Sequence, residues 1–254
     1  MVKAVIAVIN QKGGVGKTTS VINLSAYLAR AGHSVLIVDA DPQGNSTSGL
    51  GIDKHNLDST LYDVLFNRAE VSACIRPTNS HGVFLLPANS SLAAAEVELV
   101  NEVGRELKLR NVLSGLEYDY ILIDCPPSLG LLSINGLTAA SDVLVPVQTE
   151  YYAMEGLSLL LDTIQKVKAA LNPDLNLLGI VLTMYDSRTS LAEQVETEVK
   201  KHFGAKVFST VIPRNVRLAE APSFGRSIME HDKWSKGARA YKALAKELEK
   251  RLNG

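Results

Sequence analysis

Cysteine is scarce in this chain: its 254 residues include only Cys74 and Cys125, and these show no paired spacing such as CxxC. Neither a disulfide framework nor a cysteine-ligated zinc site is indicated, and a reducing, cytoplasmic setting fits. Aromatic residues are also few, at 6% against 46% hydrophobic residues in total. Aliphatic side chains must therefore fill most of the core, which the chain length allows to be sizeable.

Long hydrophobic runs are absent. The first apolar stretch, residues 4–9, is too short for the core of a signal peptide with its cleavage site. No stretch reaches the roughly 18 apolar residues that a membrane-spanning helix needs. We therefore expect a soluble, cytoplasmic protein with no stable membrane association.

An excess of one charge is also missing. The net charge is −1, which argues against a generally basic nucleic-acid-binding protein. However, residues 186–254 carry 14 Lys and Arg against 9 Asp and Glu, a net of +5, and the remaining residues carry a net of −6. A basic patch in the C-terminal quarter is compatible with this distribution, although charge alone favours an ordinary solvated helical surface.

Short apolar segments alternate with longer segments of helical periodicity. The strand-like segments are residues 4–10, 34–39, 83–86, 120–124, 143–147, 177–183 and 207–212. The helical segments are residues 17–31, 154–171, 236–252 and one that begins near Ser190, where Ser190 and Glu193 are expected to form a capping box. Strands that are apolar on both faces and alternate with helices predict a parallel sheet covered on both sides.

We therefore expect one α/β domain over residues 1–254, with a single doubly wound, mostly parallel sheet flanked by helices. Residues 49–79 have an irregular pattern and are expected to form an insertion or cap beside the core.

Residues 11–19 read QKGGVGKTT and lie between the first strand and the first helix. Glycines in such a loop let successive backbone N–H groups point at phosphate oxygens, and the helix N-terminus adds partial positive charge. Lys17 would reach the β- and γ-phosphates, Thr18 would ligate Mg²⁺, and Thr19 would contact the α-phosphate. The expected nucleotide-binding residues of the loop are Gly13, Gly14, Val15, Gly16, Lys17, Thr18 and Thr19.

Two acidic segments follow predicted strands. Residues 39–45 read DADPQGN, and residues 120–127 read YILIDCPP. Ligands of open α/β sheets bind at the carboxyl ends of the strands. Carboxylates there would repel phosphates unless Mg²⁺ or water lay between them. Asp124 matches the Walker B acid and would hold Mg²⁺ through a coordinated water. The adjacent Cys125 is expected to be a small buried residue.

The loop departs from the ordinary GxxxxGK[ST] pattern, because Gln11 replaces the first glycine and Lys12 stands at the entrance. This form resembles the deviant Walker A loop of the ParA/MinD superfamily, which belongs to the SIMIBI class of P-loop NTPases. Matches at residues 146–152, 184–189 and 212–225 resemble the short, Soj-like ParA type. The resemblance implies a MinD-like fold without the N-terminal helix-turn-helix domain of the longer plasmid type.

What the resemblance implies is an Mg²⁺-dependent ATPase that uses ATP as a dimerisation switch. Lys12 would touch the ATP of the opposite subunit, and Asp41 would orient or activate the attacking water. Asp39 would lie near the metal shell. The expected catalytic residues are therefore Lys12, Lys17 and Asp41, and the expected metal site is Thr18, Asp39 and Asp124, with the acids acting through water.

ATP is expected rather than GTP by resemblance, since the sequence has no NKxD motif. Residues 212–215 (IPRN) match the adenine-contacting stretch of the family, which implies that Pro213 and Asn215 contact the base. The alternative is a proline turn that only ends a strand.

The resemblance further implies that the ATP-bound homodimer binds double-stranded DNA without sequence preference. Arg188 and Arg217 are the candidates by position, and further basic residues are expected to help: Lys200, Lys201, Arg226 and Lys236. A ParB-type centromere-binding protein would stimulate hydrolysis during chromosome or plasmid partitioning, and the chain would associate with the nucleoid.

Four rival functions are open. A MinD-like membrane-cycling ATPase of cell-division placement needs an amphipathic C-terminal anchor, but residues 240–252 lack bulky Phe or Trp, and packing on the sheet is expected instead. An iron–sulfur ATPase of the nitrogenase-reductase type is disfavoured because Cys125 directly follows Asp124 and no CxxC exists. A small-molecule kinase would produce a phosphorylated metabolite with no DNA effect. A non-catalytic nucleotide-binding adaptor is disfavoured because both acidic segments are intact.

Overall fold

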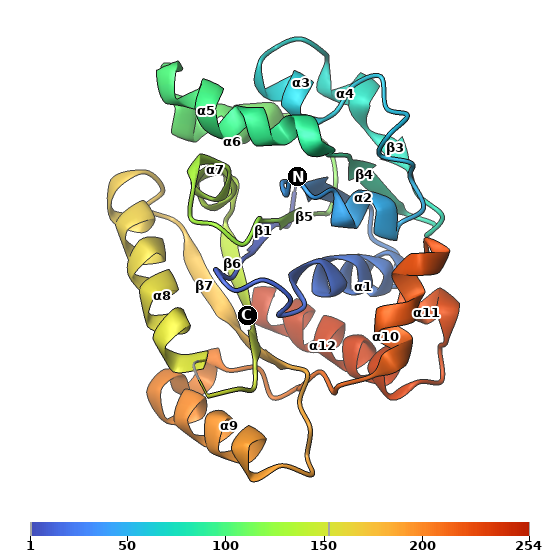
Figure 1. Ribbon diagram of the computed structural model, residues 1–254, viewed down its shortest axis with the longest axis vertical. Helices are drawn as coiled ribbons and strands as arrows, with labels where there is room; N and C mark the ends of the chain where they lie inside the picture. Colours follow the sequence, from blue (N-terminus) through green and yellow to red (C-terminus); the bar gives the residue numbers. More distant parts are fainter. Residues whose placement is uncertain (1, 152, 254) are drawn as a thin grey trace.

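A seven-stranded sheet forms the centre of the molecule, in the order β3-β4-β2-β5-β1-β6-β7 (Figure 1). The computed structural model describes residues 2–151 and 153–253, so Tyr152 of the 146–152 motif lies outside them. The strands are β1 (Ala4–Val8), β2 (Val35–Asp39), β3 (Arg76–Pro77), β4 (Val83–Leu86), β5 (Tyr120–Asp124), β6 (Asp142–Gln148) and β7 (Asn176–Thr183). Every neighbouring pair is parallel except β3 with β4, which confirms the predicted mostly parallel sheet.

Helices connect the strands. The longer ones are α1 (Lys17–Arg30), α6 (Lys108–Leu113), α7 (Leu131–Ala139), α8 (Ala153–Ala170), α9 (Ser190–Phe203) and α12 (Lys236–Leu252). The shorter ones are α2 (Asn45–Gly49), α3 (Leu61–Leu65), α4 (Val71–Cys74), α5 (Ala95–Glu98), α10 (Val216–Glu220) and α11 (Ile228–His231). Turns of 3-10 helix are η1 (Ser90–Ala94), η2 (Leu99–Asn101), η3 (Arg105–Leu107), η4 (Gly204–Lys206) and η5 (Ala221–Phe224).

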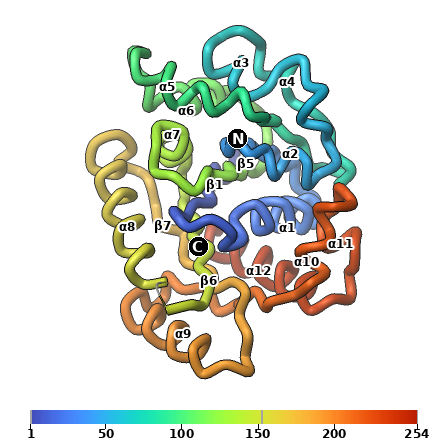
Figure 2. The backbone as a smooth tube through the Cα atoms, in the orientation of Figure 1, coloured from blue at the N-terminus to red at the C-terminus, as the bar shows by residue number. Residues whose placement is uncertain are grey.

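The side chains of the central strands belong to two hydrophobic cores, one on each face of the sheet, because successive side chains of a strand point to opposite faces. Ile6 and Val8 pack with α1 and α12, whereas Ala7 and Ile9 pack with α6, α7 and α8. Figure 2 shows α12 running beside α1 towards β7. The sheet is thus covered on both faces, as its doubly apolar strands predicted.

One predicted strand is wrong. Residues 207–212 run beside β7 and form one bridge to Ile180, but they form no strand. The N–H groups of Ser209 and Thr210 donate instead to the carboxylate of Glu247 on α12, at 2.7 and 2.9 Å. Phe208 and Ile212 still donate to the carbonyls of Ile180 and Leu182 in β7, each at 2.8 Å. The Glu247 carboxylate takes the N–H groups between them, so the ladder is interrupted and no strand forms.

The predicted capping box at Ser190 is also wrong, although α9 does begin there. Thr189 is the N-cap residue, and its hydroxyl donates to the carbonyl of Asp186 at 2.9 Å. The chain thus turns at residues 186–189, one residue earlier than the box requires. The irregular residues 49–79 hold α3, α4 and β3 at the β4 edge of the sheet (Figure 1).

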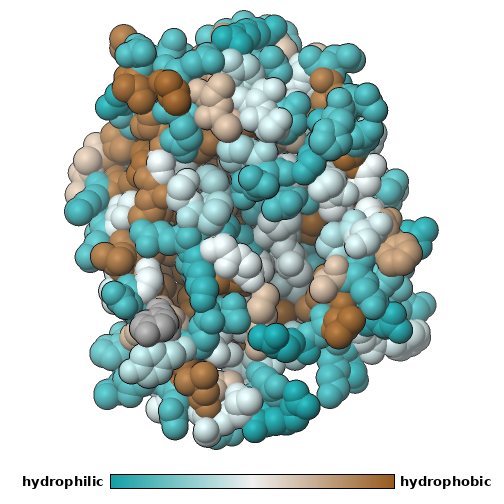
Figure 3. Space-filling model, in the orientation of Figure 1, coloured by the Kyte–Doolittle hydropathy of each residue, from teal (hydrophilic) through white to brown (hydrophobic). Residues whose placement is uncertain are grey.

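The described residues contain no helix that is long and apolar enough to cross a membrane. Hydrophobic side chains gather at the upper left of the face in Figure 3, over α5. Val97 in α5, Val100 in η2 and Val103 just after it are 72%, 53% and 97% exposed. This exposed apolar surface lies away from residues 240–252, the segment that a MinD-like membrane-cycling ATPase would need as its anchor.

Candidate nucleotide and magnesium site

Three adjacent strands end at one place. β1 leads into residues 9–16 and then α1, β2 ends at Asp39, and β5 ends at Asp124. Asp39 and Asp124 are register partners on neighbouring strands, and Val8 is the partner of Asp124 on the other side. The parallel sheet therefore brings the glycine-rich loop and both acidic segments to one edge, as the sequence predicted.

The loop has the backbone that phosphate binding needs. Gly14 and Gly16 adopt left-handed conformations, with φ of 75° and 91°, which other residues rarely adopt. A Cβ placed on Gly13 or Gly14 would meet no atom within 4 Å, so the space beside these two glycines is open. Lys17 begins α1 directly after it, which places the positive end of the helix at this opening.

Two polar residues anchor the loop to the far strands. The amide of Asn10 donates to the carbonyl of Pro146 at 2.7 Å and accepts from the Lys12 N–H at 3.0 Å. The hydroxyl of Thr183 donates to the Val15 carbonyl at 2.8 Å. Sequence reasoning missed Asn10 and Thr183, since their partners lie more than a hundred residues away, although a polar residue at the end of an apolar strand is a signal for each.

Lys17 is a buried cation, with 7% of its surface exposed, and its ammonium donates to the Lys12 carbonyl at 3.2 Å. Burial lowers the pKa of Lys17, and the neighbouring Asp124 and Asp41 act in the opposite direction. A buried ammonium at the mouth of an open anion-binding loop is well placed to pair with phosphate.

Asp124 is fully buried, and one of its oxygens has no hydrogen-bond partner. Its Oδ2 accepts from the hydroxyls of Thr18 and Ser46, each at 2.7 Å, while burial raises the pKa of the carboxyl. An unpartnered carboxylate oxygen beside a threonine hydroxyl fits Mg²⁺ held by Thr18 and, through water, by Asp124, because Mg²⁺ keeps several waters and takes few protein ligands. Ser46 was not predicted.

Asp39 is fully buried and orders the segment that follows it. Its Oδ2 accepts from the N–H and hydroxyl of Thr47 at 2.8 and 2.7 Å, and its Oδ1 accepts from the Asp41 N–H at 3.3 Å. Burial, together with the nearby Asp124 carboxylate, raises the pKa of Asp39. Asp41 is 7% exposed and accepts from the Gln43 N–H at 2.9 Å. The metal role of Asp39 and the catalytic role of Asp41 stay predictions.

Cys125 lies directly beyond this site and is fully buried. Burial raises the pKa of its thiol, and the prediction of a small buried residue is confirmed.

Lys12 points out of the loop. Its ammonium forms an ion pair with Glu150 of the same chain, and the two side chains are 54% and 32% exposed. The ion pair joins the loop entrance to the segment after β6. The expected contact of Lys12 with a second subunit stays a prediction.

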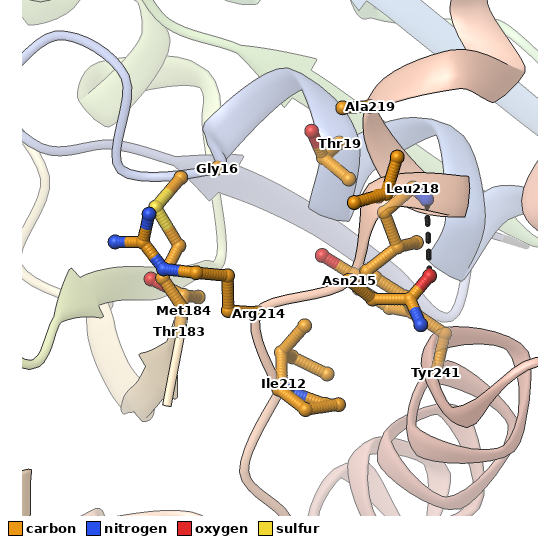
Figure 4. A pocket seen from close by; sticks show the side chains of 12 residues that line it. Gly16, Thr19, Thr183, Met184, Ile212, Arg214, Asn215, Leu218, Ala219 and Tyr241 are labelled. Atoms are coloured by element: carbon orange, nitrogen blue, oxygen red, sulfur yellow. Dashed lines mark hydrogen bonds between the residues drawn. The ribbon is translucent and has the colours of Figure 1, made fainter. Parts of the chain in front are cut away.

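A cavity of about 330 Å³ opens beside the loop (Figure 4). Pro213 and Asn215 line it together with Gly16 and Thr19, so the residues expected to contact adenine do lie next to the phosphate loop. Apolar side chains, among them Ile212 and Leu218, form much of its wall, which suits a flat base. The Asn215 Oδ1 also caps α10 by accepting from the Leu218 N–H at 3.3 Å.

Four of the six residues expected to bind DNA form ion pairs with acids of the same chain, and the other two are Arg226 and Lys236. Arg188 forms an ion pair with Asp186 at 2.7 Å, and Arg217 forms one with Glu220 at 2.8 Å. Arg188 lowers the pKa of Asp186 by hydrogen bonding. Lys200 and Lys201 are paired in the same way, with Glu196 and Glu198. The side chains of these four cations are 47% to 85% exposed, and exposed ion pairs contribute only about 0.2–1 kcal/mol, so the DNA role of these residues stays a prediction.

The fold and the site together define the class of P-loop nucleotide-binding proteins with a Mg²⁺ site.

Comparison with known proteins identifies the family within this class. A family model described as an AAA domain matches residues 3–177. The sporulation initiation inhibitor protein Soj of Bacillus subtilis is 54% identical, over 96% of this chain and 97% of that protein. The chromosome-partitioning ATPase Soj of Thermus thermophilus is also 54% identical, over 97% and 96%. The chain belongs to the ParA/Soj family of partitioning ATPases.

Solved structures agree with the fold. A Mycobacterium smegmatis protein described as cobyrinic acid a,c-diamide synthase, with bound ADP and magnesium, is 42% identical with a TM-score of 0.88, over 100% of this chain and 96% of that one. The cell division ATPase MinD of Pyrococcus furiosus is 30% identical with a TM-score of 0.79, over 97% and 98%.

Proposed function

We propose that this ATPase is an ATP-dependent dimerisation switch for DNA partitioning. The phosphate loop takes up ATP with Mg²⁺, two copies associate face to face, and the dimer binds double-stranded DNA without sequence preference. Hydrolysis, stimulated by a ParB-type centromere-binding protein, returns the chain to the monomer. The cycle runs in the cytoplasm, on the nucleoid, and the cargo is a chromosome or a plasmid.

Named relatives and neighbours support the nucleotide part. ATP and Mg²⁺ are the cofactors of this ATPase, in keeping with the M. smegmatis structures that hold ADP or an ATP analogue with magnesium. The Soj and ParA relatives are named for chromosome partitioning.

Each site residue then has one task. Backbone N–H groups of residues 13–17 hold the phosphates, and Lys17 pairs with their charge. Thr18 and, through water, Asp124 hold Mg²⁺, which when bound neutralises charge that develops on the transferred phosphoryl group. Asp41 orients the attacking water and accepts its proton. Pro213 and Asn215 contact the base.

One observation supports the proposal that two copies dimerise around ATP. The Lys12 side chain lies at the loop entrance and is 54% exposed, whereas Lys17 is buried. A cation that projects from the loop can reach a triphosphate held by a second copy. ATP drives dimerisation only if it binds the dimer better than the monomer, and a contact of Lys12 across the interface supplies that difference.

The membrane alternative needs an apolar helix face that is free. In α12, Tyr241, Leu244 and Leu248 are buried against α1 and the sheet. That face is therefore used within the molecule, which favours DNA over a membrane as the surface that the dimer binds.

ATP turnover measured with and without duplex DNA and a ParB-type peptide tests the proposal. Lys12→Ala should remain monomeric with ATP, and Asp41→Ala should accumulate as a DNA-bound dimer. Sedimentation with a non-hydrolysable ATP analogue reads out both variants. Normal dimerisation of Lys12→Ala would show that the lysine does not act across subunits.

A further inference from the structure

The short helix α2 begins at the end of the acidic segment 39–45, and it brings two neighbouring hydroxyls to the two acids at the strand ends. The Ser46 Oγ donates to the Asp124 Oδ2 at 2.7 Å. The Thr47 Oγ1 donates to the Asp39 Oδ2 at 2.7 Å. Ser46 and Thr47 are both fully buried. Since Asp39 and Asp124 are register partners on β2 and β5, one helix contacts both acids at once.

The two oxygens of the Asp124 carboxylate are used unequally. Oδ2 accepts from the hydroxyls of Ser46 and Thr18, each at 2.7 Å. Oδ1 is buried and has no hydrogen-bond partner among the described residues. Turning the carboxylate about its Cβ–Cγ bond would break both bonds to Oδ2, and hydrogen bonds to a carboxylate are strong. The two donors therefore fix the direction in which Oδ1 points.

The two donors differ in what else they do. Thr18 is the proposed ligand of Mg²⁺, so its hydroxyl has a second partner when the metal is bound. The Ser46 hydroxyl has no such task, and within residues 2–151 and 153–253 it forms a hydrogen bond with Asp124 alone. The two residues come from different elements and lie 78 positions apart in the sequence. Ser46 is thus the donor that serves only the carboxylate.

Close backbone contacts hold α2 in place. A Cβ on Gly49 would lie 2.8 Å from the Ile22 Cδ1 of α1, and Figure 1 shows the two helices side by side. A Cβ on Gly44 would lie 2.7 Å from the Ala88 carbonyl oxygen. The Ala88 N–H also donates to the Thr47 Oγ1 at 3.0 Å. Contacts this close leave α2, and with it the serine hydroxyl, little room to shift.

We propose that Ser46 is a positioning residue of the Mg²⁺ site. Its hydroxyl keeps the free oxygen of Asp124 directed at the metal shell. The inference rests on the Mg²⁺ role proposed for Thr18 and Asp124. Partners that orient a metal ligand without touching the metal contribute about 10- to 100-fold to metal affinity.

Ser46→Ala removes one of the two donors and leaves the carboxylate held by Thr18 alone. The Mg²⁺ concentration that half-saturates binding of a fluorescent ATP analogue to the full chain should therefore rise about 10-fold, the lower end of that range. Binding of the analogue in EDTA should be unchanged, because the Ser46 hydroxyl bonds Asp124 and not the phosphate loop. ATP turnover should show the same rise in its Mg²⁺ requirement and should approach the wild-type rate once Mg²⁺ saturates.

Ser48→Ala is the matched control. Ser48 lies on the same helix, and its hydroxyl donates to the Gly44 carbonyl at 3.1 Å instead of to an acid of the site. This variant also loses one hydroxyl from α2, but it should keep the wild-type Mg²⁺ requirement. Calorimetric melting of the nucleotide-free chain checks the fold of each variant. Ser46→Cys, in which a weak S–H donor replaces the hydroxyl, should show a similar rise and supplies the titration if Ser46→Ala does not fold.

A double variant shows whether the hydroxyl acts through Asp124. In Asp124→Asn the carboxylate is already lost, so adding Ser46→Ala should not raise the Mg²⁺ requirement further. The cycle of two single variants and one double variant isolates this coupling, because the two side chains are in contact.

A wild-type Mg²⁺ requirement in Ser46→Ala would overturn the inference. Equal losses of analogue binding with Mg²⁺ and with EDTA, or the same rise in Ser48→Ala, would also overturn it, because Ser46 would then only support α2. A further rise on adding Ser46→Ala to Asp124→Asn would show that the hydroxyl acts elsewhere. An unchanged Mg²⁺ requirement in Asp124→Asn would refute the proposed metal site itself, whereas the other results leave that site standing.

Discussion

Glu150 is expected to restrain dimerisation by holding Lys12 in the monomer. Lys12 must leave this ion pair before it can reach a triphosphate in a second copy. Glu150→Gln removes the charge but keeps the size of the side chain. The variant should therefore dimerise more tightly than the wild type with the same ATP analogue.

The magnitude follows from exposure. The Lys12 and Glu150 side chains are 54% and 32% exposed, and exposed pairs contribute about 0.2–1 kcal/mol. A dimer releases two such pairs, which gives about 0.4–2 kcal/mol, or a dimerisation constant larger by about 2- to 30-fold. The gain should shrink at high salt, where the pair in the wild type is screened.

Sedimentation velocity at several protein concentrations measures this constant. Glu98→Gln is the matched control, because Glu98 forms a comparably exposed pair with Arg68, at 3.2 Å, away from the loop. Lys12→Ala/Glu150→Gln should dimerise no better than Lys12→Ala, since the effect acts through the lysine. Unchanged or weaker dimerisation of Glu150→Gln would refute the restraint.

Three further predictions concern the site and its support. Asp124→Asn should weaken nucleotide binding about 10- to 100-fold with Mg²⁺ and little with EDTA; equal losses in both titrations would contradict the metal role. Glu96 accepts from the N–H groups of Leu131 and Leu132 at 2.8 and 3.2 Å, so Glu96→Ala should lower stability by about 1 kcal/mol and the Tm by about 2–4 °C. The buried amide of Asn172 donates to three main-chain carbonyls, so Asn172→Ala should cost about 1–3 kcal/mol. Wild-type melting curves from either variant, measured by calorimetry, would contradict these assignments.

The sequence predicted the strands best where apolar residues form a bounded run. β4 and β5 have the predicted limits, because Val83–Leu86 and Tyr120–Asp124 are apolar on both faces. The helix α7 was not predicted, since six of its nine residues are buried and it shows little amphipathic periodicity. The two-residue β3 is too short to carry any pattern.

Much of the nucleotide site could be predicted because its chemistry is local in sequence. The loop and the two acids each follow a strand, and a parallel sheet brings strand ends together. The supports could not be predicted, because they depend on contacts between distant residues. Thr183 reaches Val15 across 168 positions, and Glu150 reaches Lys12 across 138.

The charge of the C-terminal quarter illustrates that a sequence does not show which charged side chains form ion pairs. Its net of +5 does not distinguish a cation with a partner from one without. In the fold, Arg188 is paired with a carboxylate two residues away, whereas Lys242 and Lys246 project from a helix whose acids are bound elsewhere. Affinity for a polyanion depends on charge that is free to release counterions from it. An exposed ion pair contributes only about 0.2–1 kcal/mol, so a phosphate can displace Asp186 from Arg188, whose side chain is 85% exposed.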